Sequence, residues 1–231
     1  MTRVVLFDID GTLLASGGVG RRAMEGALRA HFGTIGPTHY RYDGKTDRQI
    51  VRESMRHAGF TDADVDARME SLLADYLARL EHTVITGDHG VRTHLGVPAL
   101  LDALDARDDV LLGLLTGNLA PGAALKLRAA GLAPERFRVG AFGSDHEQRT
   151  ELPIIAQRRA SALLGSDVAG EAVVIIGDTP ADVECGRGIG ARAVAVATGH
   201  FTVTDLAAYG PHAVVEDFTE LDAAMRAICD A

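Results

Sequence analysis

The chain has 231 residues, with 23 Lys or Arg against 32 Asp or Glu, which gives a formal net charge of −9. Hydrophobic residues make up 47% and charged residues 24%, ordinary globular values that exclude a disordered chain. The acidic balance argues against a broad nucleic-acid-binding face, because nothing would offset the repulsion of phosphates. We therefore expect one large domain, or a domain with an insert, and no nucleic-acid partner.

Cysteine content and hydropathy indicate where the protein resides. Two cysteines exclude a disulfide scaffold or a cysteine-rich zinc site and suit a reducing compartment. The apolar run at residues 4–7 is too short for a signal-peptide core, and the longer run at 110–115 is too short to span a bilayer. We expect a cytoplasmic protein, a monomer or homodimer, with no membrane partner.

Short apolar runs recur along the chain, and polar or glycine-rich residues follow each one. They lack alternation, which is typical of strands buried on both faces, and lie at residues 4–7, 111–115, 139–142, 173–176, 193–196 and 213–215. Helical patterns separate or follow them at 97–107, 120–130, 153–164, 181–188 and 221–229. The order predicts an α/β fold with a Rossmann-like, doubly wound, mostly parallel sheet.

The interval from residue 15 to residue 88 shows helical patterns and no convincing strand. One amphipathic stripe is formed by Met69, Leu72, Leu73, Tyr76, Leu77 and Leu80. A second helix is predicted over 47–58, with Asp47 as its N-cap. We therefore expect an inserted all-α cap domain at 15–88 and a core domain made of 1–14 and 89–231. Glycines on both sides of the insert are candidate hinges: Gly17, Gly18, Gly20, Gly87 and Gly90.

Acidic residues follow two of the predicted strands. Asp8 and Asp10 come after the first strand, and Asp178 and Asp182 come after the run at 173–176. In open α/β sheets ligands bind beyond the carboxyl ends of the strands, so these four carboxylates are expected at one edge. Their mutual repulsion would be relieved by a hard divalent cation, and Mg²⁺ prefers carboxylates, waters and a phosphate oxygen.

Three short motifs resemble those of the haloacid dehalogenase-like superfamily of hydrolases. They read Asp8-x-Asp10-Gly11-Thr12-Leu13, Thr116-Gly117-Asn118 and Gly177-Asp178-x-x-x-Asp182, the first, second and fourth motifs of that family. The flanking sequences are similar to phosphoglycolate phosphatase-type members along the whole chain. Residues 15–88 stand where that family carries a helical cap.

The resemblance implies a Mg²⁺-dependent phosphatase that acts on a small phosphorylated metabolite through an aspartyl-phosphate. Asp8 would be the nucleophile, and Asp10 the general acid and then the base, its pKa raised by neighbouring negative charge. Mg²⁺ would be held by Asp8, the backbone carbonyl of Asp10 and Asp178, with Asp182 nearby or acting through water. The implied phosphate-binding groups are those of Thr116, Gly11, Thr12, Gly117 and Asn118.

The third motif departs from the family pattern, which places a lysine before the next strand. Arg149 stands close to the expected position and would supply a cation to the phosphate and to Asp8, and Lys126 is the competing candidate. In the insert, Lys45 and Arg48 are candidate ligands of a substrate carboxylate or second phosphate. The alternative for this pair is two solvated cations at a helix start.

Two other functions fit parts of the same pattern. A phosphomutase of the β-phosphoglucomutase type would keep the phosphoenzyme and return the phosphate to a sugar, and the core motifs do not exclude it. A binding module switched by phosphorylation is the alternative from another class. Asp10, which would promote dephosphorylation, and the size of the cap both argue against that module.

Overall fold

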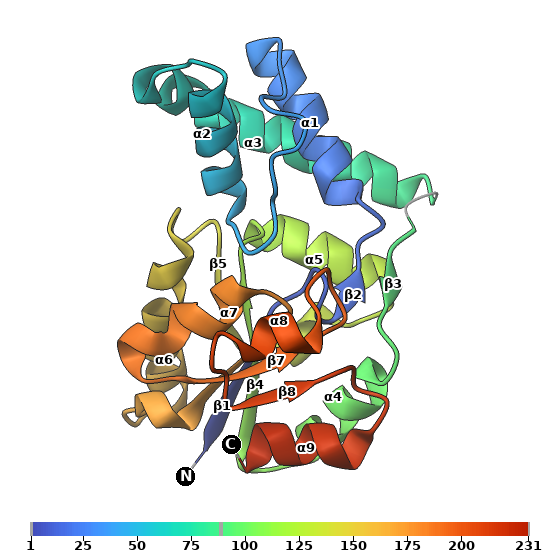
Figure 1. The fold of residues 1–231 in the computed structure, drawn as a ribbon, viewed down its shortest axis with the longest axis vertical. Coiled ribbons are helices and arrows are strands. Elements are labelled where there is room, and N and C mark those ends of the chain that lie inside the picture. Colours follow the sequence, from blue (N-terminus) through green and yellow to red (C-terminus); the bar gives the residue numbers. More distant parts are fainter. Residues whose placement is uncertain (1, 88–89, 231) are drawn as a thin grey trace.

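The computed structural model of the chain describes residues 2–87 and 90–230. Six parallel strands form one sheet in the order β5-β4-β1-β6-β7-β8, which confirms the predicted doubly wound α/β fold (Figure 1). Their bounds are Arg3–Phe7 (β1), Val110–Thr116 (β4), Val139–Phe142 (β5), Val173–Gly177 (β6), Arg192–Val196 (β7) and Ala213–Val215 (β8). Because β1 lies between β4 and β6, the loops that follow these three strands meet at the centre of one sheet edge.

Helices cover both faces of the sheet, which is why the strands are continuous apolar runs. Alternate residues of the central strands pack on α4 (Val97–Asp105), α5 (Ala120–Ala129) and α9 (Leu221–Cys229) on one face. The other face packs on α6 (Leu152–Leu164), α7 (Pro180–Cys185) and α8 (Val203–Ala207). Strand residues on both faces are therefore removed from water, and both faces contribute hydrophobic stabilisation.

Three helices between β1 and α4 form a separate group that we call the cap helices: α1 (Val19–Phe32), α2 (Asp47–His57) and α3 (Asp62–Ile85). Figure 1 shows them together over the edge of the sheet where the central strands end. The predicted α3 stripe is buried among them, with only Leu77 partly exposed. No helix in the described part of the chain is long and apolar enough to cross a bilayer.

The start of α2 differs from the prediction. Asp47 is not the N-cap, because Thr46 has the extended backbone of a cap and its hydroxyl accepts a hydrogen bond from the Gln49 amide at 3.1 Å. A threonine three residues before a glutamine is a known helix-start pattern, so the sequence contained the signal. Asp47 thus lies in the first turn of the helix, where it is buried.

A second difference lies where the chain enters and leaves the cap helices. Two short strands, β2 (Leu14–Ala15) and β3 (Arg92–Thr93), pair antiparallel and tie the two connections together. Sequence patterns did not reveal them, because two residues are too few to show a period. The predicted boundary between Asp88 and His89 lies outside the described residues, so the division into two domains stays a prediction.

Candidate active site

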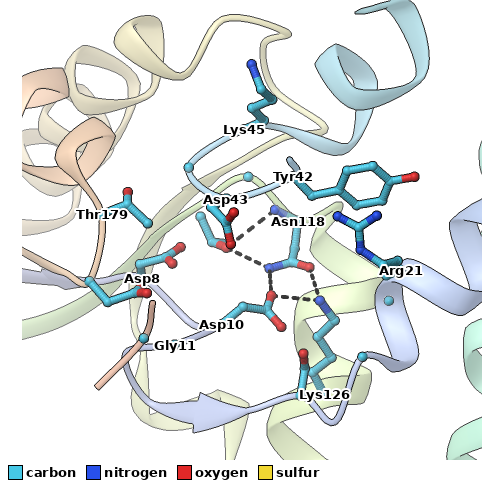
Figure 2. Close-up of a pocket in the computed structure, with 18 of the residues that line it drawn as sticks. Asp8, Asp10, Gly11, Arg21, Tyr42, Asp43, Lys45, Asn118, Lys126 and Thr179 are labelled. Carbon is cyan, nitrogen blue, oxygen red and sulfur yellow. Dashed lines mark hydrogen bonds and ion pairs between the residues drawn. The ribbon is translucent and has the colours of Figure 1, made fainter. Parts of the chain in front are cut away.

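A cavity of about 460 Å³ lies between the central edge of the sheet and the cap helices. Asp8, Asp10 and Gly11 line it from the loop after β1, and Lys45 and Tyr42 line it from the cap side (Figure 2). Thr116 lines it from the end of β4, and Gly117 and Asn118 line it from the loop that follows, with Arg149 and Asp178 also on its wall. The motif residues that are distant in sequence therefore meet around one cavity, as the strand order requires.

Asp8 directly follows β1 and is almost fully buried. A guanidinium nitrogen of Arg149 lies 3.1 Å from its carboxylate and also contacts Asp182. Burial raises the pKa of Asp8 to about 6; Arg149 opposes the shift, while the charges of Asp182 and Asp10 add to it. Of the two predicted cations, Arg149 and not Lys126 is the one that contacts Asp8.

Asp178 follows β6 and faces Asp8 across the sheet edge. Its carboxylate accepts a hydrogen bond from the Thr12 hydroxyl at 3.2 Å, and its pKa is raised well above the usual value by burial and by the charges of Asp182 and Asp8. One carboxylate oxygen from each of Asp8, Asp178 and Asp182 lies within 4.8 Å of the others. Three buried carboxylates this close repel one another, so the donor set fits a hard divalent cation such as Mg²⁺.

Within this set Asp182 differs from the other two. One of its oxygens contacts Arg149, and the other accepts hydrogen bonds from the amide and hydroxyl of Thr179 in a capping box at the start of α7. Both oxygens are therefore engaged by protein donors. This arrangement favours Asp8 and Asp178 as direct ligands, with Asp182 beside them holding Arg149.

Asp10 has a different set of partners from Asp8. One oxygen, Oδ2, accepts hydrogen bonds from Lys126 Nζ at 2.7 Å and from Asn118 Nδ2 at 2.8 Å, as Figure 2 shows. Burial would raise the pKa of Asp10, but the Lys126 charge and these hydrogen bonds outweigh it, and the pKa is lowered. The expectation of a raised pKa is therefore wrong. The Asp10 side chain lies toward Lys126, and metal binding through its backbone carbonyl stays a prediction.

The cap helices contact the loop after β4 directly. The Asp47 amide donates to the Gly117 carbonyl at 2.8 Å, and the Asp47 carboxylate accepts from the Leu119 amide at 2.8 Å. Beside them, the Thr46 hydroxyl donates to the Glu147 carbonyl at 2.6 Å. Thus the start of α2 is hydrogen-bonded to the loops after β4 and β5, and it closes one side of the cavity.

The structure separates the two cations predicted to bind substrate. Lys45 lines the cavity and lies 2.8 Å from Glu53, whereas Arg48 is outside the cavity lining and pairs with the exposed Glu70 at 2.7 Å. Arg48 therefore fits the alternative given above, a solvated cation at the start of a helix. Thr12, expected at the phosphate, is fully buried outside the cavity lining with its hydroxyl on Asp178.

Several cavity residues had no signal in the sequence. The Arg21 guanidinium lies 4.0 Å from the centroid of the Tyr42 ring and donates a hydrogen bond to the Tyr40 carbonyl. Arg21 and Tyr42 both line the cavity. Tyr76 belongs to the predicted α3 stripe, and it lines the cavity as well as the cap core. Other lining residues that the motifs did not mark include Asp43, Asp47, His94, Thr198 and His200.

The fold and site define a class of protein: an α/β protein with a doubly wound parallel sheet and a buried acidic cluster beneath helical cap elements. Comparison with known proteins agrees. Residues 153–221 match the HAD-hydrolase-like family model. N-acetylmuramic acid 6-phosphate phosphatase of Pseudomonas aeruginosa is 31% identical over 234 residues, covering 99% of this chain and 97% of the relative.

Solved structures of similar fold cover the whole chain. A hydrolase from Pseudomonas syringae has a TM-score of 0.74 at 22% identity, covering 99% of both chains. CbbY from Rhodobacter sphaeroides, solved in complex with phosphate, has a TM-score of 0.70 at 21% identity and 96% coverage of both. The chain belongs to the haloacid dehalogenase-like hydrolases, and within them it is a phosphoric monoester hydrolase.

Proposed function

We propose that this protein is a Mg²⁺-dependent phosphatase that hydrolyses a small phosphorylated metabolite through a phosphoenzyme on Asp8. The observation that carries the proposal is the cluster of three buried carboxylates beside the cavity, with Arg149 on Asp8. Asp8 and Asp178 would hold Mg²⁺, with the backbone carbonyl of Asp10. When bound, the ion offsets the negative charge of the carboxylates and of the phosphate that must approach them.

In the first step Asp8 attacks phosphorus. A bond forms between its carboxylate oxygen and phosphorus, the bond to the leaving oxygen breaks, and Asp10 gives that oxygen a proton. Because the pKa of Asp10 is lowered in the free protein, Asp10 must take up this proton from solvent as the negative charge of the phosphate enters the cavity. Arg149 and the groups of the 116–118 loop bind the phosphoryl oxygens, because charge on these oxygens must be stabilised in the transition state. Asp182 keeps Arg149 in place by the contact described above.

In the second step water attacks the phosphorus of the phosphoenzyme. Asp10 takes a proton from that water, the bond between phosphorus and Asp8 breaks, and inorganic phosphate leaves. The lowered pKa of Asp10 supports this step, since the ionised carboxylate is the form that acts as a base. The cap helices would keep bulk water out of the cavity while the phosphoenzyme exists.

The size of the cavity supports a small substrate. Its volume of about 460 Å³ suits a metabolite of the size of phosphoglycolate or a sugar phosphate. The relative at 31% identity is named for a sugar phosphate, which favours that class. Arg21 and Lys45 are cations that line the cavity from the cap side, and we propose them as candidates for a second anionic group of the substrate. Lys45 would have to leave its pair with Glu53 to bind such a group.

The test is phosphate release from a panel that includes N-acetylmuramic acid 6-phosphate, phosphoglycolate and hexose phosphates, with and without Mg²⁺. We expect Mg²⁺-dependent release with at least one sugar phosphate and none with Asp8→Asn. Release that persists in Asp8→Asn would refute the nucleophile. Phosphate moved within a sugar without net release indicates a phosphomutase, and a stable phosphoenzyme without release indicates a phosphorylation-switched binding module.

A further inference from the structure

Lys126 is a buried cation that the proposed mechanism does not use. It lies on α5 and is only 4% exposed. It contacts neither Asp8 nor Asp182, and these two carboxylates pair with Arg149 instead. Its ammonium instead lies 2.7 Å from Asp10 Oδ2 and 2.6 Å from Asn118 Oδ1. A buried lysine costs free energy of desolvation unless its partners repay it, so this placement calls for a role.

We propose that Lys126 is a positioning residue for Asp10. Its ammonium holds Asp10 Oδ2 directly, and it also orients the side-chain amide of Asn118, which donates hydrogen bonds both to that oxygen and to the Thr116 hydroxyl. This inference rests on the proposed function and assigns the geometry of its proton-transfer step. Lys126 touches no reacting atom in this role. It acts only through the side chains of Asp10 and Asn118.

The Asn118 amide carries the first part of the argument. Its Nδ2 donates to Asp10 Oδ2 at 2.8 Å and to Thr116 Oγ1 at 2.8 Å, so the proton-transfer residue and the phosphate-binding hydroxyl share one donor group. In the opposite orientation, with its oxygen and nitrogen exchanged, the Asn118 amide would present its oxygen to the Asp10 carboxylate. An ionised carboxylate has no proton to donate to that oxygen. The Lys126 ammonium has only donors, so its bond to Asn118 Oδ1 selects the productive orientation.

The accessibility of Asp10 carries the second part. Its side chain is one-third exposed, whereas Oδ1 is buried. Oδ2 is therefore the oxygen through which the carboxylate meets the cavity, and it is the one held by both donors. Fixing this atom fixes the path of the proton, because a displacement of about 1 Å in such a group can cost about 10²-fold in rate.

The space around Lys126 is shaped for an ammonium. A Cβ added at Gly20, on α1, would lie 3.0 Å from Lys126 Nζ. The glycine on α1 thus leaves room for the ammonium beside Asp10. Asp10 and Lys126 are 116 residues apart in the sequence, and the fold brings them into contact.

The test compares Lys126→Met with Arg128→Met, a matched change on the same helix that removes only the exposed pair with Glu135. The probe is p-nitrophenyl phosphate, whose leaving group needs no proton. For Lys126→Met we expect kcat to fall about 10²-fold, because phosphoenzyme hydrolysis needs the oriented Asp10. A burst of about one nitrophenolate per active site should precede the slow turnover. The value of kcat/KM, which reports the phosphorylation step, should stay within about threefold of wild type.

An alkyl ester, β-glycerol phosphate, gives the complementary result, since its leaving oxygen must be protonated. Here kcat/KM of Lys126→Met should fall together with kcat. Normal kcat with both esters would overturn the proposal. A raised KM for p-nitrophenyl phosphate with kcat retained would assign Lys126 to substrate binding and would also overturn it.

A double variant keeps the proposal testable if Lys126→Met alone fails to fold. Asp10→Asn/Lys126→Met removes both charges, so no unpaired buried charge remains. Its kcat should equal that of Asp10→Asn alone, because Lys126 acts only through Asp10, and a further loss would refute the inference. Wild type and Arg128→Met separate the two proposals: if neither releases phosphate from any ester, the proposed function fails.

Discussion

The carboxylates of the site are divided between two buried cations. Arg149 lies between Asp8 and Asp182, whereas Lys126 lies beside Asp10 and Asn118. The division matters because each cation favours the ionised form of a different aspartate. Arg149 opposes the effect of burial, which raises the pKa of Asp8 to about 6, and Lys126 helps to lower the pKa of Asp10.

Removing the cation on Asp8 should impair both folding and turnover. Arg149→Met leaves the Asp8 and Asp182 carboxylates buried without their guanidinium, which we expect to lower the free energy of unfolding by about 3–5 kcal/mol. Phosphate release should fall by about 10²–10³-fold. Arg149→Lys should recover part of both losses, and Arg158→Met, an exposed change on α6, should alter neither. Near-normal kinetics in Arg149→Met would contradict the assignment.

The buried cap residue Asp47 makes a prediction about pH. Burial raises its pKa to about 6, with Lys126 and the Leu119 amide opposing the shift. A carboxyl that binds its proton more tightly in the folded chain lowers the free energy of unfolding as the pH rises from about 4 to about 6. Asn at this position does not titrate and can still accept from the Leu119 amide.

Relative to wild type, Asp47→Asn should therefore gain stability across that interval. The gain should reach at most about 3 kcal/mol and stay constant above about pH 7. Urea unfolding at a series of pH values measures it, with the exposed Asp222→Asn as control. A difference that does not change with pH would show that Asp47 is not the titrating group.

At the scale of elements, the first turn of α2 is the contact between the cap helices and the sheet edge. It reaches the loop after β4 through both the amide and the carboxylate of Asp47. Gly117 makes this approach possible, because a Cβ there would lie 2.0 Å from the Lys45 carbonyl oxygen. Backbone atoms cannot yield as a flexible side chain does, so any larger residue must separate the two elements.

Gly117→Ala is accordingly predicted to unseat the cap helices without unfolding the sheet. We expect kcat/KM to fall by at least about 10²-fold, since the cavity no longer closes. Protease sensitivity of the cap segment should rise, while the far-ultraviolet circular dichroism stays unchanged. Gly188→Ala, where an added Cβ meets nothing within 4 Å, is the matched control. Unchanged kinetics in Gly117→Ala would contradict the closed arrangement.

At the scale of the whole molecule, the proposed ion would join the ends of two central strands. Asp8 follows β1 and Asp178 follows β6, and neighbouring carboxylates there oppose folding unless a cation offsets them. Binding to the folded chain alone at 100 times Kd adds about 2.7 kcal/mol to the free energy of unfolding. For a protein of this size that corresponds to a rise in Tm of about 5–10 °C.

The prediction is checked by thermal unfolding with and without Mg²⁺. Wild type should show the rise in Tm, and Asp178→Asn should lose most of it. Asp167→Asn, which is exposed and not part of the cluster, should retain it. An equal rise in all three proteins would mean that Mg²⁺ acts elsewhere on the chain.

The sequence by itself determined the sheet and the acidic cluster at its edge. Unbroken apolar runs indicated strands buried on both faces, and the aspartates that end β1 and β6 had to meet because parallel strands share one edge. These signals are local, so a single stretch of chain contains each of them. The N-cap of α2 was equally local and was assigned one residue too late.

Only the tertiary structure decided which side chains serve these aspartates. Lys126 pairs with Asp10 across 116 positions, and Asp47 bonds Leu119 across 72. Periodicity and turn chemistry report how a segment is buried, but not which distant segment it faces. Partners such as these depend on how the cap helices seat on the sheet, and that packing is a property of the whole chain.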